Sequence, residues 1–214
     1  MVGGVDEKTL QKWVWFMLEK INGLKPRIIR FTNRFQGWDG HTNALISVDG
    51  ADFRISVPFS RIWYSHKFHG SGVRYEVALC IQTGLIVWTN GPYPCGKWSD
   101  ITIFRHKLKK KLGRYEYAEA DKGYRGDRQI ASPDDFSEDS ENEMKFDVRA
   151  RHETVNKRMK DFAVLREKFR HHISKNDMSN HEVCFNSVAV VTQLNLHFKP
   201  LYPIYGYNLV YHEL

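Results

Sequence analysis

The first apolar pattern of the chain has the period of an amphipathic helix. Over residues 6–22 apolar side chains recur at spacings of three and four: Leu10, Val14, Met17 and Ile21. Asp6 stands directly before this stretch, where a helix N-cap is favoured. The pattern therefore predicts a helix over 6–22, followed by an irregular basic connector.

Three segments then show the two-residue period of β-strands, at 45–57, 73–82 and 85–88. The Thr83-Gly84 pair predicts a turn between the last two, so an antiparallel meander is expected. The alternation changes phase near Gly50, which predicts a bulge or bend in the first strand. Two prolines are expected to end the third strand: Pro92 and Pro94.

The second half of the chain alternates helical patterns with one short strand. Residues 133–143 are rich in acids and almost free of apolar residues, which predicts a solvated loop or disordered insert. Around it we expect a helix from Ser99 or Asp100, a strand over 115–121, a helix over about 149–170 and a last helix that begins at the capping box Ser179-x-x-Glu182.

This order of elements predicts an α/β fold with a mixed sheet: three antiparallel strands, a helix and a further strand, flanked by helices. No repeat and no linker divides the chain. We assign residues 1–40 to an N-terminal helix and connector, 41–200 to one main domain with an acidic insert at 133–147, and 201–214 to a C-terminal tail.

Composition narrows the class of protein. The chain has 214 residues, 42% of them hydrophobic, and no apolar run long enough for a transmembrane helix or a signal peptide, so we expect an intracellular protein with no membrane partner. Its three scattered cysteines favour neither a disulfide framework nor a zinc site. The net charge of +7 favours an anionic partner, and nucleic acid is the commonest one.

Three carboxylates stand out by position. Asp49 interrupts an apolar strand, Asp121 ends the short strand before Gly123, and Glu153 lies on the long helix. Each also has an ordinary interpretation: a solvent-facing edge residue, a turn former, and part of a charged helix face. Asp52 competes with Asp49 for the same role. Clustered carboxylates can hold two divalent ions that act on a phosphodiester, because Mg²⁺ prefers oxygen ligands.

Several segments resemble, in order, the Harbinger-type transposase nucleases of the DDE superfamily and the related bacterial insertion-sequence transposases. They are ISVDGADFRI at 46–55, KFHGSGVRYEV at 67–77, GKWSDITIF at 96–104, EADKGYRG at 119–126 and VRARHETVNKRMKDF at 148–162. The bacterial relatives carry a Tyr-x2-Arg-x3-Glu-x6-Lys signature. This chain has Phe146, Arg149, Glu153 and Lys160 at those positions, so Phe replaces the signature's Tyr.

The resemblance implies a ribonuclease H-like fold, which the element order suits, and a metal-dependent endonuclease that cuts and joins DNA at transposon ends. It assigns the catalytic and metal-binding roles to Asp49, Asp121 and Glu153, with two Mg²⁺ or Mn²⁺ ions. Supporting roles fall to Asp100, Arg149 and Lys160, although Asp100 is equally well explained as a helix N-cap. Candidate DNA contacts are Lys107, Lys109, Lys110, Lys157 and Lys160.

Two further expectations come from the resemblance alone. Because the sequence has no convincing helix-turn-helix, a separate Myb-like DNA-binding partner is implied, and the relatives imply a nuclear protein, with the cytoplasm as the alternative. A homo-oligomer is compatible with the sequence. Two other interpretations stay open: a catalytically inactive, transposase-derived module that binds DNA or protein, and an unrelated domain whose acids lie far apart.

Overall fold

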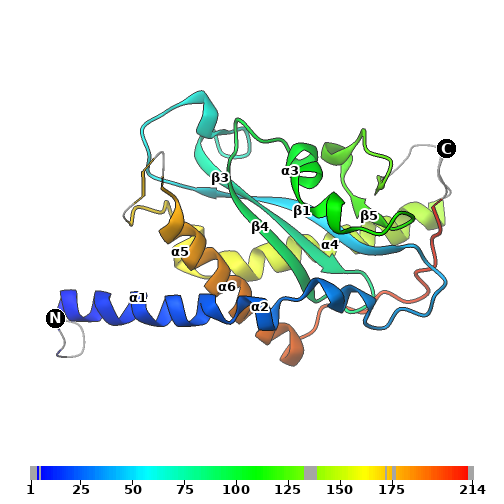
Figure 1. Ribbon diagram of the computed structural model, residues 1–214, viewed down its shortest axis with the longest axis horizontal. Coiled ribbons are helices and arrows are strands. Elements are labelled where there is room, and N and C mark those ends of the chain that lie inside the picture. The colour runs from blue at the N-terminus through cyan, green and yellow to red at the C-terminus, as the bar shows by residue number, and fades with distance from the viewer. Residues whose placement is uncertain (1–3, 5, 133–138, 172, 175–176, 212–214) are drawn as a thin grey trace.

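The computed structural model describes residues 4, 6–132, 139–171, 173–174 and 177–211. At its centre is a mixed sheet of strand order β2-β3-β1-β5-β6, with β4 paired to β3 (Figure 1). β3 is antiparallel to β1, β2 and β4, whereas β5 is parallel to β1 and β6. The strands are β1 Ala44–Arg54, β2 Tyr64–Ser65, β3 Gly70–Cys80, β4 Ile86–Pro94, β5 Tyr117–Ala120 and β6 Ile130–Ala131. The predicted α/β mixed sheet is confirmed and is consistent with a ribonuclease H-like fold.

Helices flank both faces of this sheet. α4, α5 and α6 contribute to the apolar cluster on one face, and α3 contributes to the cluster on the other. The helices are α1 Glu7–Gly23, α2 Lys25–Ile28, α3 Asp100–His106, α4 Asp139–Lys160, α5 Ala163–Arg166 and α6 Ser179–Phe198. Among the described residues, no helix combines the length and the apolar character needed to cross a membrane.

Of the bulge or bend predicted near Gly50, the bulge is wrong. β1 keeps one continuous register with β3 through Asp49↔Val77, Gly50↔Glu76 and Ala51↔Tyr75. The phase of the apolar residues changes because β1 is buried on both faces. Val48 packs in the cluster with α3, and Phe53 packs in the cluster with α4 and α6. A strand that is covered on both sides does not need alternating polarity.

Pro92 does not end the third strand, because β4 continues beyond it, but the strand does end at Pro94 as expected. The pairing of β4 with β3 shifts register between Arg74 and Glu76, opposite the segment that contains Pro92. Such an irregularity lets a proline lie in a strand without donating to the ladder. β4 is therefore longer than its apolar residues suggested.

Three helix predictions are corrected. α4 begins at Asp139, nearly three turns before the expected start and within acidic sequence, and it ends at Lys160. Residues 133–138 of the predicted insert lie outside the described part. α6 has Met178 at its N-cap, and the Asp177 carboxylate, not Ser179, accepts a backbone N–H there. α1 is capped by Asp6 as expected, but most of its predicted apolar face is exposed: Leu10, Val14 and Met17.

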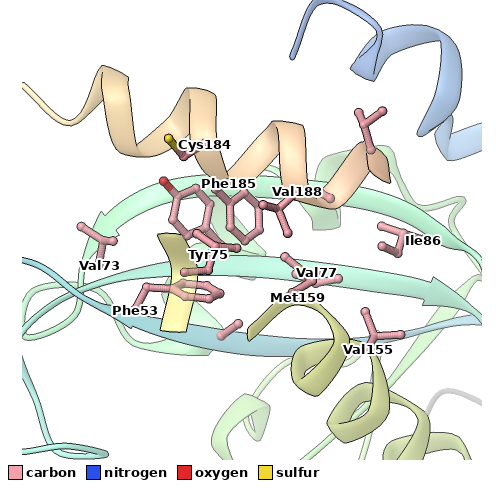
Figure 2. Close-up of a cluster of buried hydrophobic side chains, with 14 of the residues drawn as sticks. Phe53, Val73, Tyr75, Val77, Ile86, Val155, Met159, Cys184, Phe185 and Val188 are labelled. Atoms are coloured by element: carbon pink, nitrogen blue, oxygen red, sulfur yellow. The ribbon is translucent and has the colours of Figure 1, made fainter. Parts of the chain in front are cut away.

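The larger core lies between the sheet and the helices α4 and α6. Figure 2 shows Phe185 and Val188 of α6 above the sheet and Val155 and Met159 of α4 beside it. The rings of Tyr75 and Phe185 are stacked at 3.7 Å between centroids. This core holds α4 against β1 and so fixes the position of that helix on the sheet.

Tyr75→Phe should lower the free energy of unfolding by about 1–3 kcal/mol. The buried Tyr75 hydroxyl lies 2.8 Å from Nδ1 of His181, whose Nε2 has no partner among the described residues. The substitution leaves a second buried imidazole nitrogen unpaired. Urea unfolding measures the loss. Tyr205→Phe, at a ring 84% exposed, is the matched control and should change stability by no more than about 0.5 kcal/mol.

Candidate active site

Asp49 and Asp121 occupy adjacent positions at the edge where β5 ends: Asp49 lies in the middle of β1, and Asp121 directly follows β5. β1 and β5 are parallel neighbours, and their last paired residues are Val48 and Ala120. Asp49 and Asp121 are the next residue of each strand. The carboxyl ends of neighbouring parallel strands are where α/β sheets place ligand-binding groups. The register thus joins two acids that are far apart in the sequence.

Each of these carboxylates is oriented by a nearby backbone N–H group. Oδ1 of Asp49 accepts from the Gly50 N–H at 2.7 Å, and its Oδ2 accepts from Nδ2 of Asn156 at 3.2 Å. Asp121 is the N-cap of a short 3-10 turn, and its Oδ1 accepts from the Gly123 N–H at 2.8 Å. Asp49 is half-buried and Asp121 is exposed, so solvent and a polymeric substrate can reach this edge.

α4 crosses the sheet beside the two acids. Nε2 of His152 lies 2.8 Å from Oγ of Ser47, two residues before Asp49 on the same side of β1. Burial lowers the pKa of His152, while the carboxylates of Asp49 and Asp121 act to raise it. The turn of α4 from His152 to Asn156 therefore lies within the field of both acids.

Glu153 lies on that same turn with its side chain exposed to solvent. Among the described residues it makes no hydrogen bond or ion pair, and its charge contributes to the raised pKa of Tyr202. The described residues contain no group of three or more His, Cys, Asp or Glu side chains placed to hold one ion. The structure thus brings Asp49 and Asp121 together and places Glu153 on the adjoining helix, outside a closed cluster.

Asp100 approaches the same strand from the opposite face. It is the first residue of α3, and a Cβ added at Gly50 would lie 2.0 Å from its Oδ1. Nη1 of Arg74 is 3.2 Å from that oxygen, yet the buried Oδ1 has no hydrogen bond. Burial raises the pKa of Asp100 to about 6, with Asp49 and Asp52 adding to the rise against Arg74 and Lys67.

These features fit a divalent cation. The ligand atoms available at this edge are carboxylate oxygens, the donors that Mg²⁺ and Mn²⁺ prefer. A buried carboxylate oxygen of Asp100 without a hydrogen bond lies close behind them, and the charges of Asp49 and Asp52 act to raise the pKa of Asp100. A cation near Asp49 would offset that repulsion.

Asp52, the competitor of Asp49, is fully engaged elsewhere. Nε and Nη2 of Arg74 donate to its two oxygens at 2.6 and 3.0 Å, and Oγ of Ser65 donates at 2.6 Å. Burial acts to raise the pKa of Asp52, but these hydrogen bonds lower it below the ordinary value. Asp52 is therefore held in an ion pair with Arg74 and a hydrogen bond with Ser65.

The predicted basic residues fall into two groups. Lys160 and Lys157 lie on α4 beyond Asn156, and Arg149 lies one turn before Glu153 on the same helix. The ammonium of Lys160 is 5.5 Å from the ring of Phe53; burial and the charge of Lys67 lower its pKa, whereas Asp52 and Asp49 act to raise it. Lys160 therefore borders the acids.

The second basic group follows α3, on the chain leading to the amino end of β5: Lys107, Lys109 and Lys110. Lys109 is committed to an ion pair with Asp127 at 2.8 Å, while Lys107 and Lys110 are exposed. Asp121 follows the opposite, carboxyl end of β5, and Asp49 lies beside it in the middle of β1. This group is thus not joined to the candidate site.

Three residues at the site had no role in the sequence analysis: His152, Asn156 and Lys67. Asn156 shares the helix stripe of Glu153, so its direction was readable, but its contact with Asp49 depends on tertiary packing. Nζ of Lys67 donates to the carbonyl oxygen of Gly50 at 2.8 Å, from a connection whose course the sequence does not define.

The sequence profile of a family described as DDE superfamily endonuclease matches residues 48–193 of this chain. The match spans Asp49, Asp121 and Glu153. No match was found among curated proteins or solved structures.

Proposed function

The chain belongs to the DDE superfamily endonucleases, and we propose that it cuts DNA phosphodiester bonds with divalent metal held by Asp49, Asp121 and Glu153. The observation that carries the proposal is the β1–β5 register, which makes Asp49 and Asp121 neighbours beside α4. The acid of the helix, Glu153, would supply the third carboxylate. Two ions of Mg²⁺ or Mn²⁺, when bound, activate the attacking oxygen and stabilise the leaving oxygen.

The surrounding residues hold the acids in place. Asn156 and the Gly50 N–H fix the two oxygens of Asp49, and the Gly123 N–H fixes Asp121. Because burial lowers its pKa, His152 is neutral near pH 7 and anchors the α4 turn to Ser47. Ligands that are oriented before the metal arrives lose less entropy when it binds.

DNA would approach along the exposed edge that carries Asp121. Lys160, Lys157 and Arg149 lie along α4 on the path of such a strand, where they would contact backbone phosphates. Lys107 and Lys110 would contact more distant phosphates. The family resemblance extends the proposal to strand joining at transposon ends, in which a 3′-hydroxyl replaces water, and to a Myb-like partner that supplies sequence recognition.

Nicking of supercoiled plasmid should require Mg²⁺ or Mn²⁺. We expect conversion to the open circle with either ion and none above background with excess chelator, because the carboxylates alone cannot activate water. Agarose gels resolve the two forms. Ca²⁺ is the matched control ion, because it also binds oxygen ligands but with a larger and more flexible coordination shell than Mg²⁺. Equal nicking in chelator would contradict the proposal.

A non-catalytic DNA-binding module is the second candidate. It is favoured by the position of Glu153, whose carboxylate makes no contact with the other acids among the described residues. This candidate predicts metal-independent DNA binding and no nicking with any ion. The plasmid assay therefore separates the two functions.

A further inference from the structure

We propose that the connection between β1 and β3, residues 55–69, inserts Phe59 and Ile62 as an apolar wedge between DNA bases beside the cleaved bond. The inference rests on the proposed nuclease function and names how that site would grip its substrate. The connection rises past the end of the sheet and is cyan in Figure 1. None of residues 55–69 is a proposed metal-binding acid, although Lys67 lies beside the site.

The tip of the connection is strongly apolar and exposed. Phe59 is 71% exposed and Ile62 is 50% exposed. Behind them the ring of Tyr64 packs edge-on against Phe59 at 6.1 Å and against His66 at 5.0 Å. Large apolar side chains exposed together on a surface mark an interaction site more often than isolated ones do.

The backbone below this tip is fixed. Trp63 is buried in the larger core, and the Gly96 N–H donates to the Ile62 carbonyl oxygen at 2.9 Å. The chains approach so closely there that a Cβ at Gly96 would lie 1.9 Å from the carbonyl oxygen of Arg61. Oγ of Ser65 donates to Asp52. Phe59 and Ile62 are thus presented by an anchored loop, which suits insertion into a partner.

The same connection reaches back to the candidate active site. Nζ of Lys67 donates to the carbonyl oxygen of Gly50, the residue after Asp49. After burial, the charges of Lys67 and Arg54 are among the causes that lower the pKa of Lys160. The guanidinium of Arg54 lies 5.2 Å from the ring of Phe68. Lys67 and Arg54 of this part of the chain therefore act on the charge of Lys160, which borders the acids.

This combination of charge and exposed rings matches DNA. Phosphates would neutralise these cations, and bases would stack on the exposed side chains. Apolar side chains that enter a base step unstack it and bend the duplex, which opens the backbone to a neighbouring active site.

The test compares two duplexes of equal length, one fully paired and one with a central two-base mismatch. Binding is measured in Ca²⁺ with the Asp121→Asn chain, so that cutting does not intervene. We expect tighter binding to the mismatched duplex, because its bases unstack more easily. The double variant Phe59→Ala, Ile62→Ala should lose about 5- to 100-fold of affinity for it, the range of one or two stacking contacts.

Phe198→Ala is the matched control, because Phe198 is 84% exposed on α6 and is distant in the sequence from residues 55–69. The Phe198→Ala chain should bind both duplexes like the parent chain. Phe59→Trp keeps an aromatic face and should retain the preference. Unchanged binding by the double variant, or a parent chain that binds both duplexes equally or neither, would overturn the wedge. Plasmid nicking by the native chain, scored separately, reports on the nuclease proposal alone.

Discussion

Asp121→Asn should lower the rate of metal-dependent nicking by about 10³-fold or more, without lowering the melting temperature. Asn keeps an oxygen that can accept from the Gly123 N–H, so the turn after β5 persists. It removes the negative charge that a divalent ion requires. The rate is measured on supercoiled plasmid at saturating Mn²⁺, and thermal unfolding is followed by circular dichroism.

Glu153→Gln extends this prediction to the third proposed acid, which lies on α4 outside a closed cluster with Asp49 and Asp121. We expect the same loss of nicking with unchanged stability, because the exposed Glu153 side chain has no partner among the described residues. Asp100→Asn is the comparison variant, because the Asp100 carboxylate packs directly against Gly50, the residue after Asp49. If Asp100→Asn abolished nicking while Glu153→Gln did not, Asp100 would be the third acid and the family signature would mislead here.

Local patterns were sufficient to predict most elements of the fold. β3 follows its two-residue alternation, α3 starts at Asp100, and α1 follows Asp6, because these features depend on neighbours in the sequence. The errors occur where distant packing decides. β1 is covered on both faces, β4 passes through Pro92 beside β3, and α4 extends into acidic sequence that has no apolar stripe.

The candidate site was only partly readable for the same reason. Asp49 and Asp121 could be selected as acids at strand positions, but their adjacency depends on the parallel pairing of β1 with β5. The sequence offered Asp52 as an equal to Asp49, and only the bidentate ion pair with Arg74 distinguishes them. Such pairings join residues far apart along the chain and carry no local signal.

The ion pair between Arg74 and Asp52 predicts a large, pH-dependent loss of stability when Arg74 is replaced. Arg74→Met should lower the free energy of unfolding at pH 7 by about 3–5 kcal/mol, because it leaves the buried carboxylates of Asp52 and Asp100 without their shared cation. Met fills similar volume, so the loss comes mainly from charge. Urea unfolding at several pH values measures it, and Arg54→Met, at an exposed arginine, should cost no more than about 1 kcal/mol.

The sign of the pH dependence follows from the two acids. In the native chain Arg74 and Ser65 hold the pKa of Asp52 below its ordinary value, so that Asp52 stabilises the fold at neutral pH and this contribution is lost as the pH falls through its folded pKa. Burial already raises the pKa of Asp100 to about 6. Without Arg74 both pKa values rise, and the folded variant takes up protons as the pH falls. The difference in free energy of unfolding between the native chain and Arg74→Met should therefore narrow from pH 7 toward about pH 5. If this difference stayed constant with pH, lost packing and not unpaired charge would be the cause of the lower stability.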